Sequence, residues 1–225
     1  MRNIQGELPM DCRGPDPLAA FIFAGHARTL VLESVHSSLL SAVTSFSSRA
    51  YSFFLLSADD QGSTKGHAPV TVDEDDVRAA VAHFKPNAVL KYEHADASRP
   101  IIPTACILNG TAHNGKVGDY ALRQSGQTWL LAWWQTWHRL HRALDMVLAY
   151  EAEHALTFNW VVKLRPDAWF YAPGPSHCEI ERAARRHSSH VGTSSSMRAV
   201  VTPAGVAGCV APCVNDHLAW IPREH

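Results

Sequence analysis

The sequence predicts an α/β fold in which a mostly parallel sheet carries helices on both faces. Short apolar runs of strand length alternate with longer segments whose apolar residues recur every three to four positions, as in amphipathic helices. The 225 residues, 46% of them hydrophobic, suffice to bury one sizeable core. We therefore expect a polar N-terminal segment over residues 1–20 and a single domain over residues 21–225.

The expected elements follow from this periodicity and from the residues that interrupt it. Glycine and proline end several apolar runs, and a cluster of carboxylates marks the start of a helix, where the helix dipole favours negative charge. In chain order we expect a strand over Phe21–Ala24, a helix over Arg28–Phe46, a strand over Tyr51–Ser57, a helix over Asp73–Phe84, a strand over Asn87–Tyr92, a helix over Gln127–His154, a strand over Asn159–Leu164, a helix over Glu179–Arg186, a strand over Ala199–Thr202 and an apolar stretch over His217–Pro222.

The helix over residues 127–154 has the plainest pattern in the chain. Tryptophans and leucines form one stripe along it, which is more typical of a core than of a ligand site. Trp134 lies off that stripe and stays a candidate for stacking on a sugar. The preceding residues 95–125 have no period, which predicts either a lid or binding loop, or disorder.

Charge and targeting patterns exclude several classes of partner. The formal net charge is −1 and the isoelectric point about 6.9, so no overall field attracts nucleic acid or an anionic membrane. No run reaches the roughly 18 apolar residues of a membrane span, and no signal peptide is recognisable. We expect a cytoplasmic protein by default, or a secretory one if the N-terminus is incomplete. The five cysteines are expected to be small buried residues.

Polar residues at the ends of the predicted strands mark one binding mouth, because ligands of parallel sheets bind beyond the carboxyl ends of the strands. At the first strand end, Gly25 and His26 open a turn in which Arg28 and backbone N–H groups can meet the diphosphate of a nucleotide. Asp59 follows the second strand and joins the same candidate nucleotide site. The turn lacks the glycine pattern of dinucleotide-binding folds, so a plain turn with an exposed arginine is the alternative.

The strongest chemical signal is at the end of the strand over Asn159–Leu164, where Arg165 and Asp167 stand two residues apart. Asp167 can ligate Mg²⁺ or Mn²⁺ that bridges two phosphates, while Arg165 can neutralise the charge of a leaving group. The alternative is a local pair of these two side chains that holds the turn. Nearer the C-terminus, Asp216 suits a general base or a ligand of a substrate hydroxyl, although Asn215 and Asp216 together are also ordinary in turns.

Three motifs follow one another along the chain, at Gly25–Thr29, Trp160–Asp167 and Asn215–Ala219. A Gly-x-x-Arg-Thr turn, a Trp-Val-Val-x-Leu-Arg-Pro-Asp strand and an Asn-Asp-x-hydrophobic-Ala segment recur in this order in a family of GT-A-like glycosyltransferases. The chain resembles that family over roughly residues 21–223, although the motifs cover a small part of this span. The resemblance implies a Rossmann-like GT-A sheet and transfer of a sugar from a nucleotide donor to a hydroxyl acceptor, such as a glycan.

The resemblance also implies roles for the candidate residues. GT-A enzymes usually keep an Asp-x-Asp metal motif where this chain has Arg165 and Asp167, so Asp167 would hold Mn²⁺ or Mg²⁺ and Arg165 would partly replace the metal. Arg165 and Asp216 would be catalytic, and Asn215 and Trp134 would lie on the acceptor side. GT-A domains usually continue beyond the last motif, so we expect this chain to be a fragment or a shortened sequence.

Two other functions stay open. A non-catalytic module on the same fold would keep a nucleotide or glycan pocket without turnover. The 14 histidines suggest a metal-dependent hydrolase, although no His-Glu-x-x-His motif accompanies them.

Overall fold

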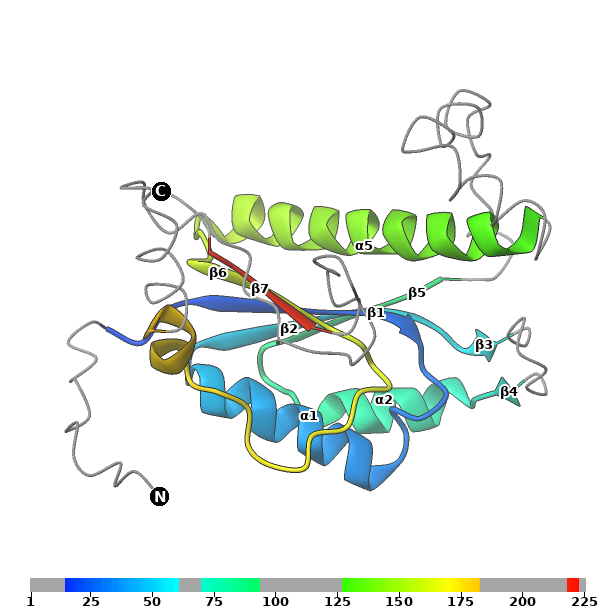
Figure 1. The fold of residues 1–225 in the computed structure, drawn as a ribbon, viewed down its shortest axis with the longest axis horizontal. Helices are drawn as coiled ribbons and strands as arrows, with labels where there is room; N and C mark the ends of the chain where they lie inside the picture. Colours follow the sequence, from blue (N-terminus) through cyan, green and yellow to red (C-terminus); the bar gives the residue numbers. More distant parts are fainter. Residues whose placement is uncertain (1–14, 61–69, 94–126, 183–217, 223–225) are drawn as a thin grey trace, which may run out of the picture.

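The computed structural model describes residues 15–60, 70–93, 127–182 and 218–222; the side chains of 59–60, 70, 127–137, 218–220 and 222 are not described. This part of the chain forms a layered α/β fold (Figure 1). Its elements are β1 (Ala19–His26), α1 (Glu33–Phe46), β2 (Ala50–Ser57), β3 (Asp59–Asp60), β4 (Val70–Thr71), α2 (Glu74–Ala82), β5 (Ala88–Tyr92), α5 (Gln127–His154), β6 (Trp160–Leu164) and β7 (Leu218–Pro222). None of the helices in these ranges is long and apolar enough to cross a membrane.

The main sheet has five strands within the described residues, in the order β5-β2-β1-β6-β7. β1 pairs in parallel with β2 and β6, and β2 pairs in parallel with β5, whereas β7 lies antiparallel to β6 at one edge. Ile22, in the middle of β1, is opposite Phe53 of β2 and Lys163 of β6. The predicted α/β class with a mostly parallel sheet is confirmed, and a Rossmann-like arrangement is compatible with it.

Alternating side chains of β1 supply the cores on both faces of the sheet. Phe21 and Phe23 belong to the core shared with α1 and α2, whereas Ala20 and Ile22 belong to the core shared with α5. All four residues are at most 2% exposed. Burial on both faces explains why β1 is a continuous apolar run rather than an alternating one.

The chain reverses its direction across the sheet after β5. β1, β2 and β5 succeed one another toward one edge with α1 and α2 on one face, and α5 then leads back to β6 on the other side of β1. Because parallel crossover connections are right-handed, this reversal places α5 on the opposite face, as Figure 1 shows. β1 and β6 are thus neighbours whose connections leave in opposite directions.

The first half of the chain departs from the predicted elements at two places. The helix predicted from Arg28 begins at Glu33, because residues 27–32 form turns closed by backbone hydrogen bonds. Asp59, predicted at the binding mouth, lies in β3, which pairs with β4 in a separate two-stranded sheet. The extended backbone therefore continues beyond the end of β2 instead of turning at the acidic pair.

The helix predicted from Glu179 begins earlier, at residue 177. Ser176 starts it with a capping box, since both the N–H and the hydroxyl of Ser176 donate to the Glu179 carboxylate, at 2.8 and 2.9 Å. Cys178, in the first turn, is half-buried and disulfide-bonded, which corrects the expectation of a small buried residue. The strand predicted over Ala199–Thr202 lies outside the described residues.

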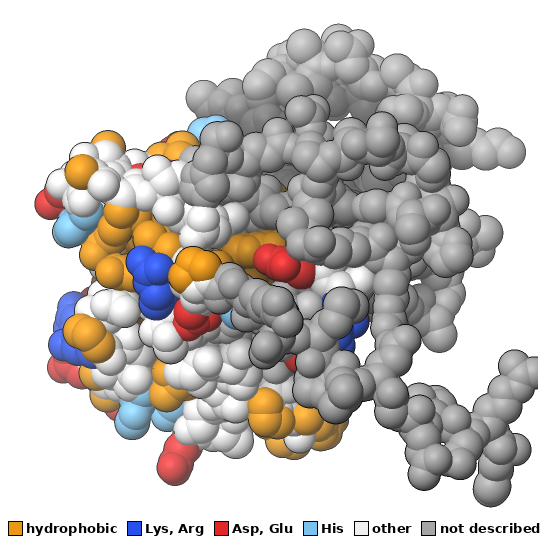
Figure 2. All heavy atoms as spheres, turned by 90° about the vertical axis from the view of Figure 1, so that its left-hand side faces the viewer, with side chains coloured by type: hydrophobic (Ala, Val, Ile, Leu, Met, Phe, Trp, Pro, Cys, Tyr) orange, Lys and Arg blue, Asp and Glu red, His pale blue; other side chains and the backbone are white. Residues whose placement is uncertain are grey.

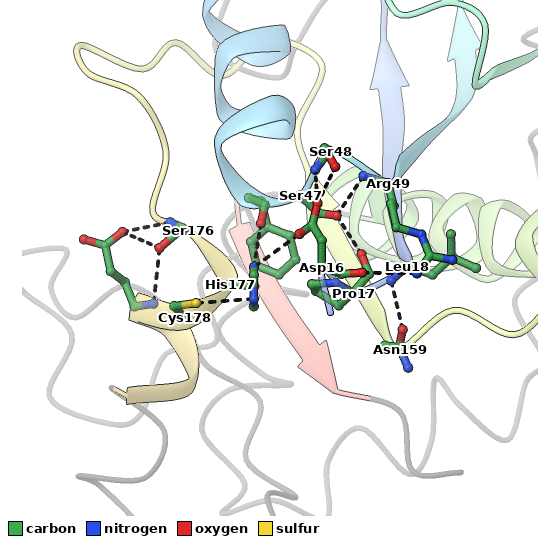
Figure 3. A network of polar contacts seen from close by, with 12 residues as sticks. Asp16, Pro17, Leu18, Ser47, Ser48, Arg49, Asn159, Ser176, His177 and Cys178 are labelled. Carbon is green, nitrogen blue, oxygen red and sulfur yellow. Dashed lines mark hydrogen bonds and ion pairs between the residues drawn. The ribbon is translucent and has the colours of Figure 1, made fainter. Parts of the chain in front are cut away.

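Segments far apart in the sequence close the edge at which the parallel strands begin (Figure 3). The Asp16 carboxylate accepts hydrogen bonds from the N–H and hydroxyl of Ser48, and the side chain of Asn159 accepts one from the Leu18 N–H at 2.9 Å. These contacts tie the residues before β1 to the rest of the sheet, and β1 itself begins two residues earlier than predicted. Figure 2 views this edge, where described hydrophobic, basic, acidic and histidine side chains are interspersed.

A buried ion cluster ties the end of β5 to α5. The Glu93 residue is 4% exposed, and its carboxylate accepts a hydrogen bond from Arg139 Nε at 2.6 Å and another from Arg142. Arg139 is itself buried. Burial removes water from each charged group at a cost in free energy, and the attraction between carboxylate and guanidinium groups offsets that cost. Removal of one charge therefore leaves the others buried without compensation.

Replacement of this carboxylate, Glu93→Gln, should lower the free energy of unfolding by about 3 kcal/mol, since two guanidinium groups lose their counter-charge. Urea unfolding followed by circular dichroism measures the change. Glu153→Gln, at an exposed position of α5, is the matched control and should change stability by less than about 0.5 kcal/mol. Equal small effects in both variants would contradict the structural role of Glu93.

Candidate functional site

The point at which the chain reverses, between β1 and β6, brings two of the three sequence motifs together. Both strands end at the same edge because they are parallel. A Cβ atom added at Gly25, near the end of β1, would lie only 3.1 Å from Pro166 Cγ, just beyond the end of β6. Ligands of open α/β sheets bind at this kind of reversal, outside the carboxyl ends of the strands.

The turn after β1 is a fixed frame for Arg28 and Thr29. Ala27 and Leu30 are fully buried, and the Ala27 N–H donates to the last carbonyl of β2 at 2.9 Å. The Leu30 carbonyl lies 3.1 Å from Nδ1 of the buried His36 in α1; since a carbonyl only accepts, Nδ1 is the donor. The turn is therefore attached both to the sheet and to α1.

Two arginines, one from each strand end, share the carboxylate of Asp167. Arg165 donates from Nε to Oδ1 and from Nη2 to Oδ2, both at 2.7 Å, and Arg28 donates from Nη2 to Oδ2 at 3.0 Å. The Asp167 side chain is 15% exposed, whereas those of Arg28 and Arg165 are 32% and 33% exposed. The three side chains together carry one net positive charge, which suits an anion such as phosphate.

Opposing effects determine the pKa of Asp167. Burial alone would raise it, but hydrogen bonds and positive charge from Arg165, and then from Arg28, outweigh burial and lower the pKa from 3.8 to about 2. The carboxylate is consequently ionised at neutral pH and a poor proton acceptor. Asp167 serves to hold two arginines from different strands at one place.

The described residues around Asp167 do not by themselves make a site for Mn²⁺ or Mg²⁺. Three guanidinium hydrogen bonds use most of the roughly four acceptor positions of this carboxylate, and the two positive charges beside it oppose a cation. Such cations take about six oxygen ligands, and within the described ranges no three His, Cys, Asp or Glu side chains group together. The metal at Asp167 stays a prediction, and no step proposed below depends on it.

The structure brings one group of the predicted residues together, and the side chains of the others are not described. The group at the reversal point consists of Gly25, His26, Arg28, Arg165 and Asp167. The local Arg165–Asp167 pair, the alternative drawn from the sequence, exists and is joined by Arg28. Of the remaining predicted residues, Asp59 and Trp134 have backbone positions in β3 and α5 without described side chains, and Asn215 and Asp216 lie outside the described residues.

Two further residues belong to this site, although the sequence did not single them out. The hydroxyl oxygen of Thr29, the residue after Arg28, is buried and has no hydrogen-bond partner among the described residues. Pro166 is buried and meets Gly25. Both stand inside the recognised motifs, but their role depends on a contact between strands that no local pattern shows.

Comparison with known proteins found no match to this chain among protein-family models, curated proteins or solved structures.

Neutralisation of the shared carboxylate, Asp167→Asn, should lower the free energy of unfolding by about 2 kcal/mol at pH 7. The pKa of Asp167 is lower in the folded state, about 2 against 3.8, so its stabilisation is complete above about pH 4 and disappears as the pH falls toward 2. The stability difference from wild type should shrink over that interval. Urea unfolding at several pH values measures it, with exposed Asp76→Asn as the control. A difference independent of pH would contradict this account.

A methyl group at position 25, in Gly25→Ala, should cost about 1–3 kcal/mol of stability. The added Cβ would lie 3.1 and 3.2 Å from two ring carbons of Pro166, and the Gly25 φ of +156° is uncommon for residues with a side chain. Thermal unfolding measures the cost. Gly174→Ala is the control, because Gly174 is equally crowded but lies against Ala42 of α1, away from the site, so it shows the effect of crowding on stability alone. Only Gly25→Ala should also weaken ligand binding at the site.

Proposed function

We propose that the chain is a glycosyltransferase that moves a sugar from a nucleotide-sugar donor to a hydroxyl acceptor. The observation that carries this proposal is the convergence of Arg28 and Arg165 on Asp167 at the reversal point of a parallel sheet. A nucleotide sugar presents a diphosphate, which is an anion of the size and charge that two arginines can bind bidentately.

The chemistry of the leaving group gives Arg165 and Arg28 their proposed roles. When the bond between sugar and diphosphate breaks, negative charge grows on the departing phosphate oxygen, and fixed guanidinium groups stabilise it without rearrangement. Thr29 would donate its hydroxyl to a phosphate oxygen, and Gly25 would let Pro166, and with it the turn that carries Arg165 and Asp167, lie close to the end of β1. Asp167 would keep the arginines in position, rather than take a proton itself.

The acceptor side of the proposed reaction rests on residues that the structure does not describe. Asp216 stays the predicted general base, Asn215 and Trp134 stay predicted acceptor contacts, and Asp59 a predicted nucleotide contact. Within the described residues of this site the carboxylate, Asp167, has a pKa of about 2 and does not suit proton abstraction. This observation favours a second candidate, a module that binds the nucleotide without turnover.

Binding of nucleotides tests the proposed donor site. At 100 times its Kd, the matching member of a panel of UDP, GDP, ADP and CMP should raise the free energy of unfolding by about 2.7 kcal/mol and Tm by about 5–10 °C. Arg165→Ala and Arg28→Ala should each remove most of the shift, measured by differential scanning fluorimetry. The control Arg78→Ala removes an exposed arginine that is likewise paired with carboxylates, on α2, and should keep it. A panel without any shift, with or without Mn²⁺, would refute the proposal.

The variant Asp167→Asn separates an arginine site from a metal site. If the arginines bind the diphosphate directly, wild type and variant both bind the nucleotide in EDTA, and addition of Mn²⁺ changes neither Kd. If Asp167 instead binds through Mn²⁺, wild-type binding requires the metal and the variant loses it. Release of the sugar from the donor nucleotide by the purified protein then distinguishes a transferase from a binding module.

A further inference from the structure

Two large aromatic side chains lie exposed on the segment that follows Asp167. Trp169 is 54% exposed and Tyr171 is 89% exposed, and their ring centroids are 4.5 Å apart with the rings tilted by 46°. Aromatic side chains of this size contribute strongly to core stability when buried. Trp169 and Tyr171 instead contact one another in solvent, two and four residues after Asp167. Exposure of both rings side by side suggests that they bind a ligand.

The backbone holds these rings in a fixed position. Ala168 and Phe170, which alternate with the exposed pair, pack against the core shared with α1. The Phe170 N–H donates to the Ser38 hydroxyl of α1 at 3.4 Å, and further along Gly174 approaches Ala42 so closely that an added Cβ would lie 3.0 Å from its Cα. The segment crosses beside α1 in Figure 1, and its inward residues anchor it. The outward rings are thus presented before any ligand arrives.

The composition of this segment selects the kind of ligand. Residues 168–176 contain no Lys, Arg, Asp or Glu, so nothing in the segment itself attracts a polyanion or an anionic lipid. The two rings together expose roughly 300 Å² of aromatic surface. A stable protein interface needs about 800 Å² from each partner, which this pair does not approach.

We propose that Trp169 and Tyr171 form a stacking platform for an uncharged glycan, which is the acceptor of the transfer. The C–H groups on one face of a pyranose are polarised by the ring and hydroxyl oxygens, and they complement the electron-rich faces of aromatic rings. The naming of this glycan as the acceptor rests on the proposed function. The position of the platform on the segment leaving the Arg165–Asp167 turn brings a bound glycan toward the departing diphosphate.

Calorimetric titration of the full chain with cellotetraose, chitotetraose, laminaritetraose and mannotetraose tests the platform. At least one tetrasaccharide should bind, Trp169→Ala should raise its Kd at least tenfold, and Tyr171→Ala should raise it severalfold. Trp169→Phe should recover part of the affinity, because a smaller aromatic face remains. Leu148→Ala, which removes an exposed apolar side chain of α5, should bind as wild type.

Failure of all four sugars to bind would overturn the proposal, as would equal binding by wild type and a Trp169→Ala, Tyr171→Ala double variant. The nucleotide-induced shift in Tm, measured on the same variants, keeps this outcome separate from the donor site. A lost glycan affinity with an intact nucleotide shift confirms a platform distinct from the donor site. Glycan binding without any nucleotide shift would leave the platform standing and refute the transferase.

Discussion

The structure of the site depends on one carboxylate that two arginines share. Asp167 accepts hydrogen bonds from Arg165 on its own strand end and from Arg28, which is 139 residues away along the chain. The bond from Arg28 crosses the boundary between β1 and β6, and Pro166 lies close to Gly25 at the same boundary. Without the carboxylate, two positive charges would repel one another where the strands end. The hydrogen bonds to Asp167 therefore position both arginines, and the negative charge of Asp167 offsets the repulsion between the two guanidinium groups.

The sheet explains why this pairing lies where a ligand can reach it. A chain that moves outward through β2 and β5 and then returns to β6 leaves β1 and β6 adjacent, with their connections directed to opposite faces. The opposite edge has a different character, because Asp16, Ser48 and Asn159 close it with hydrogen bonds among themselves and the backbone. Hydrogen bonds thus join separate segments at the edge where the strands begin, and the arginine cluster lies at the edge where they end.

The sequence predicted what depends on local pattern and missed what depends on contacts across the sheet. The apolar run of β1 and the stripe of α5 predicted their elements, and Arg165 with Asp167 was recognisable because the two lie two residues apart. Turns were harder: the helix expected from Arg28 begins at Glu33, since buried Ala27 and Leu30 draw the chain into turns first. Arg28 was predicted at the same mouth, because parallel strands end at one edge of a sheet. Its bond to Asp167 was not predicted, nor was the Glu93–Arg139 pair, 46 residues apart, because both form only when distant strands and helices meet. The exposure of Trp169 and Tyr171 could not be predicted from the sequence, because it depends on the packing of Ala168 and Phe170 against the core.

The most direct measurement of the central claim is the response of individual arginine side chains to inorganic pyrophosphate. Pyrophosphate carries the diphosphate charge without base or sugar, so it probes the cluster alone. In ¹H–¹⁵N NMR spectra assigned by Arg→Lys substitution, the Nε–Hε signals of Arg28 and Arg165 should shift in a saturable manner while that of Arg78 stays in place. Saturable shifts elsewhere, with both cluster arginines unchanged, would contradict the assignment of this site.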